Sequence, residues 1–164
     1  MRAWRIACEA HALDRTGAAG ATGNGRWHGA GHPVIYAACS VELCVLEAIV
    51  LCAGARPSDL MLVELTLPDD DALYERCALA NRPRWRTIPP STDSIDLGRD
   101  FLRAGRALAL HVPSALVPEA TQLLINPEHP RFEQVGMRIL RPFDLGLFDP
   151  TSASVSDGLH DSAR

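Results

Sequence analysis

Residues 40–54, Ser-Val-Glu-Leu-Cys-Val-Leu-Glu-Ala-Ile-Val-Leu-Cys-Ala-Gly, decide how the chain folds. Ser40 is a typical helix N-cap and Gly54 a typical stop, so the stretch predicts a helix over residues 41–53. Apolar residues run nearly all round this helix, which is typical of a helix packed on every side. We therefore expect it to lie, fully packed, at the centre of the fold.

Glu47 is the one charge in the middle of the predicted helix. At about 100° per residue it falls on the same side as Leu43, Leu46 and Val50, so its carboxylate should point into the protein. A carboxylate there must be paired, hydrogen-bonded or neutralised, because burial of a bare charge costs several kcal/mol or more. Spacing alone favours a structural ion pair, or a residue at a pocket edge without chemistry, over a functional carboxylate.

The rest of the chain predicts a mixed α and β arrangement. The 164 residues suit one domain, which we place at residues 1–150; the small, polar residues 151–164 predict a C-terminal tail. Strands are expected at residues 2–7, 34–37, 60–67, 107–112, 122–125 and 135–140, and further helices at 73–80 and 96–104. The predicted fold class is therefore α+β, a mixed sheet with a central buried helix.

Composition and charge exclude several classes of protein. All 16 basic residues are arginine, so Walker A, Schiff-base and protein-kinase lysines are absent. The net charge is −4 and the arginines are scattered, which argues against direct binding of DNA or RNA. No signal peptide or membrane span is expected, because charges, glycine or proline interrupt every apolar stretch. Five cysteines without a Cys-x-x-Cys motif indicate reduced residues in a cytoplasmic protein.

The glycine-rich residues 17–31 predict a long loop, and loops of this length are usually functional or disordered. Its central Arg-Trp-His, residues 26–28, argues for function. Residues 20–25, Gly-Ala-Thr-Gly-Asn-Gly, reverse the spacing of the dinucleotide fingerprint and precede no helix, so a Rossmann site is not expected. The histidines at 28 and 32 lack a cysteine pair or a His-Glu-x-x-His helix, and no metal site is predicted.

Five segments occur in the order and approximate spacing of one family. They are residues 25–28 (Gly-Arg-Trp-His), 34–37 (Val-Ile-Tyr-Ala), 46–48 (Leu-Glu-Ala), 112–114 (Val-Pro-Ser) and 124–130 (Leu-Ile-Asn-Pro-Glu-His-Pro). Together they resemble the RES domain family, the toxins of RES-Xre toxin–antitoxin systems, over nearly the whole chain. The arginine, glutamate and serine that name the family fall on Arg26, Glu47 and Ser114, and its tyrosine on Tyr36. His28 stands where the family commonly has asparagine.

The resemblance implies a fold similar to ADP-ribosyltransferases and an attack on NAD+ at the bond between nicotinamide and ribose. Glu47 would stabilise the oxocarbenium-like transition state, as glycosidase carboxylates do. Arg26 would hold the pyrophosphate or orient Glu47. Tyr36 would stack on the nicotinamide or ribose, and Ser114 would bind the ribose or position the attacking group. The expected catalytic residues are Glu47, Arg26 and Ser114; the expected substrate-binding residues are Arg26, Trp27, Tyr36, Ser114 and Asn126.

The function implied is that of a cytoplasmic type II toxin that degrades NAD+ by hydrolysis or phosphorolysis and arrests growth. NAD+ is the substrate, and no cofactor or metal is expected. A cognate Xre-type helix-turn-helix antitoxin would inhibit the toxin, and DNA would be bound only through that antitoxin. Two alternatives stay open: an ADP-ribosyltransferase that modifies a host protein, and a catalytically dead binding module in which Glu47 and Arg26 form an ion pair. The sequence also leaves a homodimer open.

Overall fold

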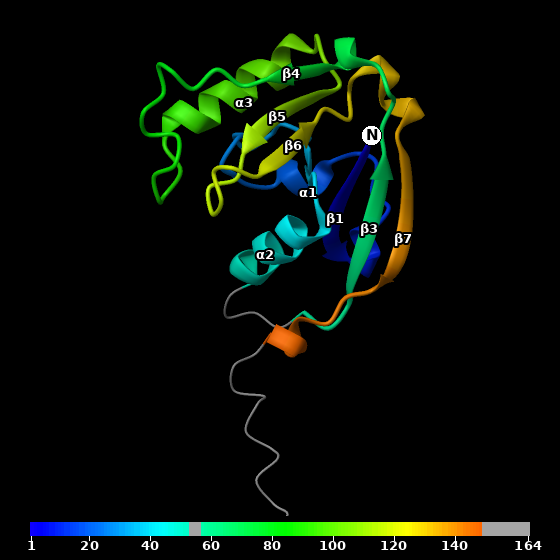
Figure 1. Ribbon diagram of the computed structural model, residues 1–164. Coiled ribbons are helices and arrows are strands. Elements are labelled where there is room, and N and C mark those ends of the chain that lie inside the picture. Colours follow the sequence, from blue (N-terminus) through cyan, green and yellow to red (C-terminus); the bar gives the residue numbers. More distant parts are fainter. Residues whose placement is uncertain (53–56, 149–164) are drawn as a thin grey trace, which may run out of the picture.

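The computed structural model describes residues 1–52 and 57–148, which form one curved mixed sheet with helices against it (Figure 1). Within these residues the sheet has seven strands in the order β4-β5-β6-β2-β1-β3-β7. Neighbouring strands are antiparallel except β4 and β5, which are parallel. The strands are β1 (Arg2–Cys8), β2 (Ile35–Ala38), β3 (Leu60–Thr66), β4 (Tyr74–Arg76), β5 (Ala109–Pro113), β6 (Thr121–Ile125) and β7 (Gly136–Pro142).

The described helices are few and short, and the first α-helix forms within residues 17–31, where only a loop was predicted. The α-helices are α1 (Ala18–Ala21), α2 (Val41–Leu51) and α3 (Thr92–Ala104), and the 3-10 helices are η1 (Glu9–His11), η2 (Asp71–Leu73), η3 (Pro130–Gln134) and η4 (Leu145–Phe148). None of the helices in the described part of the chain is long and apolar enough to cross a membrane. The predicted α+β class with a mixed sheet is confirmed. The predicted tail at 151–164 and the predicted stop at Gly54 lie outside the described residues.

The two faces of the sheet carry different hydrophobic clusters, because side chains alternate along each strand. In β2, Ile35 and Ala37 join a cluster that also holds Val63 of β3 and Leu123 of β6. The cluster therefore runs across this face from β6 through β2 and β1 to β3. Tyr36 faces the opposite side, which carries both α2 and α3.

Helix α2 begins as predicted but packs on one side only. The Ser40 hydroxyl accepts a hydrogen bond from the Leu43 N–H at 3.2 Å, which is the expected N-cap. Leu43, Cys44 and Ala48 are buried, whereas Val50 is 48% exposed. Leu46 and Leu51 are 37% and 87% exposed. The prediction of a fully packed helix is therefore wrong, because the second side of α2 borders an open pocket and solvent.

The predicted helix at residues 73–80 is also wrong. Asp70 caps a single 3-10 turn through the Ala72 N–H, and β4 follows directly. Strand β4 pairs with β5, from Tyr74 opposite Ala109 to Arg76 opposite His111. This non-local pairing overrides the local helical preference. Helix α3 forms as predicted but begins at Thr92, four residues earlier than the expected start.

Helix α3 lies close against the glycine-rich loop at Gly98. A Cβ atom at this position would lie 1.6 Å from the Trp27 carbonyl oxygen, so only glycine fits. The Trp27 ring packs beside Phe101 and Leu102 of α3 in one buried cluster. Gly98 therefore fixes the position of the loop segment that follows Arg26.

We expect Gly98→Ala to lower the free energy of unfolding by about 2 kcal/mol or more, because the added methyl group overlaps a backbone oxygen. At an unhindered helix position the same change would stabilise by about 1 kcal/mol. Gly23→Ala is the control, since no atom lies within 4 Å of a Cβ built there. Urea unfolding of the three proteins measures the effect. A Gly98→Ala protein at least as stable as wild type would contradict the close packing.

Candidate active site

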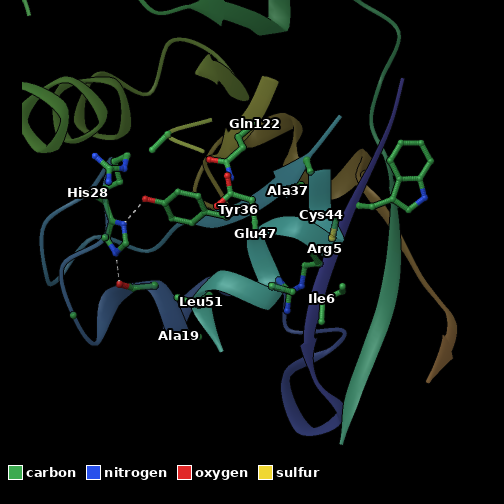
Figure 2. Close-up of a pocket in the computed structure, with 18 of the residues that line it drawn as sticks. Arg5, Ile6, Ala19, His28, Tyr36, Ala37, Cys44, Glu47, Leu51 and Gln122 are labelled. Carbon is green, nitrogen blue, oxygen red and sulfur yellow. Dashed lines mark hydrogen bonds between the residues drawn. The ribbon is translucent and has the colours of Figure 1, made fainter. Parts of the chain in front are cut away.

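A cavity of about 540 Å³ opens on the sheet face that carries α2 (Figure 2). Its walls come from β1, the glycine-rich loop, β2, α2, and the residues Ala115 and Gln122. The charged side chains of the lining are Arg5, Arg26 and Glu47. The pocket thus combines one carboxylate with two guanidinium groups, within the size range of small-molecule sites.

Ser114 holds the Glu47 carboxylate in place. The Ser114 hydroxyl, immediately after β5, donates to Glu47 Oε1 at 2.6 Å. The same hydroxyl oxygen accepts the Leu116 and Val117 N–H groups at 3.0 and 3.2 Å. These two donors orient the hydroxyl so that its proton points at Glu47. Among the described residues nothing donates to Oε2, which leaves that oxygen of this pocket-lining carboxylate for a ligand.

Arg26 lies in the same pocket without pairing directly to Glu47. Its Nη1 donates to the carbonyls of Trp85 and Thr87, each at 3.0 Å. Across residues 1–52 and 57–148, no ion pair within 4.0 Å joins Arg26 to Glu47, and Nε and Nη2 of Arg26 have no partner. Burial lowers the pKa of Arg26, and the charge of Glu47 offsets part of this effect. The Arg26 guanidinium is therefore held in one orientation, and its Nε and Nη2 edge is available to a ligand.

Arg5 is a pocket residue that the sequence reasoning missed. It enters the lining from β1, and its Nη2 donates to the His11 carbonyl. Its Nε is buried without a partner in the described part of the chain. Burial lowers the pKa of Arg5, against the opposing effect of Asp14 and then Cys44. An arginine inside the otherwise apolar run Ala3-Trp4-Arg5-Ile6-Ala7 was the available signal.

Tyr36 is held at the pocket wall by the loop. Its hydroxyl accepts the Trp27 N–H at 3.1 Å and lies 2.8 Å from His28 Nδ1. The other ring nitrogen of His28, Nε2, lies 2.6 Å from the Gly20 carbonyl oxygen. Burial raises the pKa of Tyr36, so its phenol stays protonated at neutral pH. Figure 2 shows the Tyr36 ring pointing its hydroxyl at His28.

Three expected substrate-binding residues, Trp27, Ser114 and Asn126, are not part of the pocket lining. Ser114 is fully buried and contacts Glu47 instead. The Trp27 side chain is fully buried and stacks on Trp85, with ring centroids 5.7 Å apart. Asn126 is 2% exposed; its amide donates to the Leu102 carbonyl at 3.4 Å, and its Oδ1 accepts the Glu128 N–H at 3.0 Å. The geometry gives no support to a substrate-binding role for Trp27 or Asn126, because both side chains contact neighbouring protein groups outside the pocket lining. Arg26, Tyr36, Glu47 and the hydroxyl of Ser114 do come together.

Comparison with known proteins now identifies the family. The model of the RES domain matches residues 2–145. The chain belongs to the RES family. Among its relatives, the "Prs ADP-ribosylating toxin" of Sphingobium sp. (strain YBL2) is 39% identical over 90% of this chain and 93% of its own length. "Toxin Res" of Pseudomonas putida is 37% identical over 85% of this chain and 93% of its own. This RES chain is accordingly a toxin.

A solved structure supports the fold. The M. tuberculosis MbcT–MbcA toxin–antitoxin complex matches this RES chain with a TM-score of 0.63 at 16% identity, covering 88% of this chain and 83% of that one. At this identity the match concerns the fold alone. No group of three or more metal-ligating side chains occurs within the described residues.

The pKa of His28 predicts a pH dependence of stability. Burial lowers this pKa below its usual value of about 6.5, against the opposing effect of nearby carbonyl groups. The unfolded chain therefore binds the proton more readily, and the stability held above pH 6.5 is lost as the pH falls through the folded-state pKa. We expect wild type to lose more unfolding free energy between pH 7.5 and 5.5 than His28→Gln. Burial also lowers the pKa of His111, but this residue is present in both proteins and contributes equally to both. Equal losses of unfolding free energy in wild type and His28→Gln would contradict the lowered pKa of His28.

Proposed function

We propose that this RES toxin belongs to a type II toxin–antitoxin system and cleaves NAD+ at the bond between nicotinamide and ribose. The observation that carries the proposal is the Ser114–Glu47 hydrogen bond of 2.6 Å, which orients a carboxylate in a pocket shared with two arginines. A dinucleotide needs this pairing of charges, because its pyrophosphate is anionic and its reacting ribose becomes cationic. The site requires no further cofactor.

The proposed reaction begins as the bond from ribose C1′ to the nicotinamide nitrogen lengthens. Its electron pair goes to that nitrogen, so nicotinamide leaves as a neutral molecule and needs no acid catalyst. Positive charge grows on C1′ and the ring oxygen, where the carboxylate of Glu47 stabilises it. Water or phosphate then adds to C1′. Addition of water releases one proton and gives ADP-ribose, and addition of phosphate gives ADP-ribose phosphate.

The other pocket residues bind the dinucleotide. The available Nε and Nη2 edge of Arg26 suits two oxygens of the pyrophosphate, because a guanidinium offers parallel N–H donors. Arg5 adds a second positive charge from β1 to the same pocket. The Tyr36 ring gives a flat surface for the nicotinamide or ribose. Ser114 acts through Glu47, since its donor and acceptor positions already have protein partners.

Transfer of ADP-ribose to a protein is the second candidate. It is favoured by the name of the Sphingobium relative, an ADP-ribosylating toxin. The same bond breaks in this reaction, and only the acceptor differs. The third alternative, a dead binding module held by a Glu47–Arg26 ion pair, lacks support, because Arg26 donates to the Trp85 and Thr87 carbonyls instead.

We expect Glu47→Gln to cut the rate of nicotinamide release about 100-fold or more, since it removes a charge that stabilises the transition state. Glu42→Gln is the matched control, because Glu42 is an exposed residue of the same helix. The assay incubates purified protein with NAD+, with and without phosphate, and identifies the products. Melting curves accompany each variant.

The products decide between the candidates. ADP-ribose or ADP-ribose phosphate supports NAD+ degradation, and ADP-ribose attached to an added host-protein extract supports the transferase. Full turnover by Glu47→Gln would refute the role of Glu47. No product of any kind from wild type would refute the enzyme.

We further propose that a cognate Xre-type antitoxin covers this pocket in the cytoplasm and that DNA is bound only through the antitoxin. A toxin that consumes a central cofactor must be silenced while folded, and arginines suited to pyrophosphate can also bind a partner's carboxylate. The exposed Leu46, Val50 and Leu51 lie beside the pocket on α2, which supports a covering partner. The M. tuberculosis neighbour was solved with its antitoxin.

Co-expression with the antitoxin encoded beside the toxin tests this arrangement. We expect the purified complex to release nicotinamide far more slowly than the free toxin, and excess NAD+ to restore part of the rate by competition. Leu51→Asp should weaken the complex, because it places a charge in the covered apolar surface. A stable complex that cleaves NAD+ at the free rate would rule out coverage of the pocket.

A further inference from the structure

His28 lies in a chain of hydrogen bonds that runs from the backbone of Trp27 to the backbone of Gly20. The Trp27 N–H donates to the Tyr36 hydroxyl oxygen at 3.1 Å. That oxygen lies 2.8 Å from His28 Nδ1, and His28 Nε2 lies 2.6 Å from the Gly20 carbonyl oxygen. Figure 2 draws the last two of these contacts. The chain therefore joins β2 to two points of the glycine-rich loop.

The direction of each hydrogen bond follows from the two ends of the chain. The Gly20 carbonyl can only accept, so His28 Nε2 must carry a proton. A neutral imidazole then has an unprotonated Nδ1, which accepts the proton of the Tyr36 hydroxyl. Tyr36 keeps an oxygen lone pair for the Trp27 N–H. Every donor in the chain thus has an acceptor.

The loop is shaped around this imidazole. A Cβ atom at Gly25 would lie 2.3 Å from His28 Cε1, 2.5 Å from Nδ1 and 2.9 Å from the Tyr36 hydroxyl. The Gly25 N–H also donates to the His28 carbonyl at 3.0 Å. His28 is 5% exposed. The ring therefore occupies a closed socket that a larger residue at position 25 would fill.

We propose that His28 is a positioning residue that sets the orientation of Tyr36 and fixes the pocket side of the glycine-rich loop. Nδ1 holds the Tyr36 hydroxyl, and Nε2 holds the loop at Gly20. Residues 19, 20 and 22–26 line the pocket, so this second contact also restrains the segment that carries Arg26. The inference rests on the proposed function in one respect: Tyr36 is taken as the surface on which the nicotinamide or ribose stacks.

The tautomer of His28 tests the hydrogen-bond chain without any assay of activity. Nitrogen-15 NMR of the histidine rings in the free wild-type protein, assigned with His28→Gln, reports which nitrogen carries the proton. We expect protonated Nε2 and unprotonated Nδ1 at pH 7.5. A proton on Nδ1, or rapid averaging of the two tautomers, would overturn the inference.

Two variants separate the two contacts. In His28→Asn the side-chain oxygen can replace Nδ1 and accept from Tyr36, but the side chain is too short to reach Gly20. In His28→Gln the longer side chain can replace Nε2 as the donor to Gly20, but Tyr36 loses its acceptor. His32→Asn is the control for loss of a histidine from the same loop, since His32 does not line the pocket.

We expect His28→Gln to lower kcat about tenfold through the misplaced Tyr36, the scale of one lost neutral hydrogen bond. His28→Asn should keep kcat within about twofold and raise KM several-fold, because the pocket side of the loop loses its contact at the Gly20 carbonyl. His32→Asn should match wild type. A role in folding alone would lower the apparent kcat of both variants in proportion to their active fraction and leave KM unchanged in both. That result would overturn the inference, as would wild-type kinetics in both variants. Absence of nicotinamide release from wild type would instead refute the proposed function, while the tautomer measurement still decides the hydrogen-bond chain.

Discussion

The hydrogen bond from the Ser114 hydroxyl to Glu47 joins the two parts of the fold that build the pocket. Glu47 comes from α2, and Ser114 follows β5, so the contact spans 67 residues of sequence. The hydroxyl can point at the carboxylate because the N–H groups of Leu116 and Val117 occupy its oxygen. The position of α2 on the sheet, set by buried Leu43 and Cys44, brings the carboxylate within reach. Without this arrangement, Glu47 would be a charge on a helix with no fixed direction.

Outside the short helix α1 (Ala18–Ala21), the glycine-rich loop is ordered by packing and not by regular structure. Its Trp27 is fixed against α3, where Gly98 allows the backbones to touch. Its His28 is fixed against Tyr36 of β2. Arg26 directly precedes these two anchored residues, and its guanidinium is held by carbonyls of the segment that leads into α3. A loop of weak local preference can thus present an arginine in one orientation, as functional loops on rigid scaffolds do.

The sequence predicted the helix that bears Glu47, the mixed sheet and the need for a partner to the carboxylate, because these follow from local periodicity and from the cost of burying charge. It did not predict that α2 would be open on one side, since periodicity reports apolarity and not what covers it. The helix at residues 73–80 failed because pairing between β4 and β5 is non-local. Trp27 and Asn126 were assigned to the substrate by resemblance, but burial depends on contacts with α3 and on turns that no local pattern reveals. Arg5 interrupts an apolar run, which is a local signal of an unusual position, but its place in the pocket depends on neighbours from distant segments.

A crystal structure with a non-hydrolysable NAD+ analogue would test the central claim most directly. The account predicts that the Ser114–Glu47 hydrogen bond persists and that Glu47 Oε2 lies within about 3.2 Å of a hydroxyl of the nicotinamide ribose. The pyrophosphate should lie against the Nε and Nη2 edge of Arg26. An analogue bound outside this pocket, or bound inside it with Glu47 turned away from the ribose, would contradict the account.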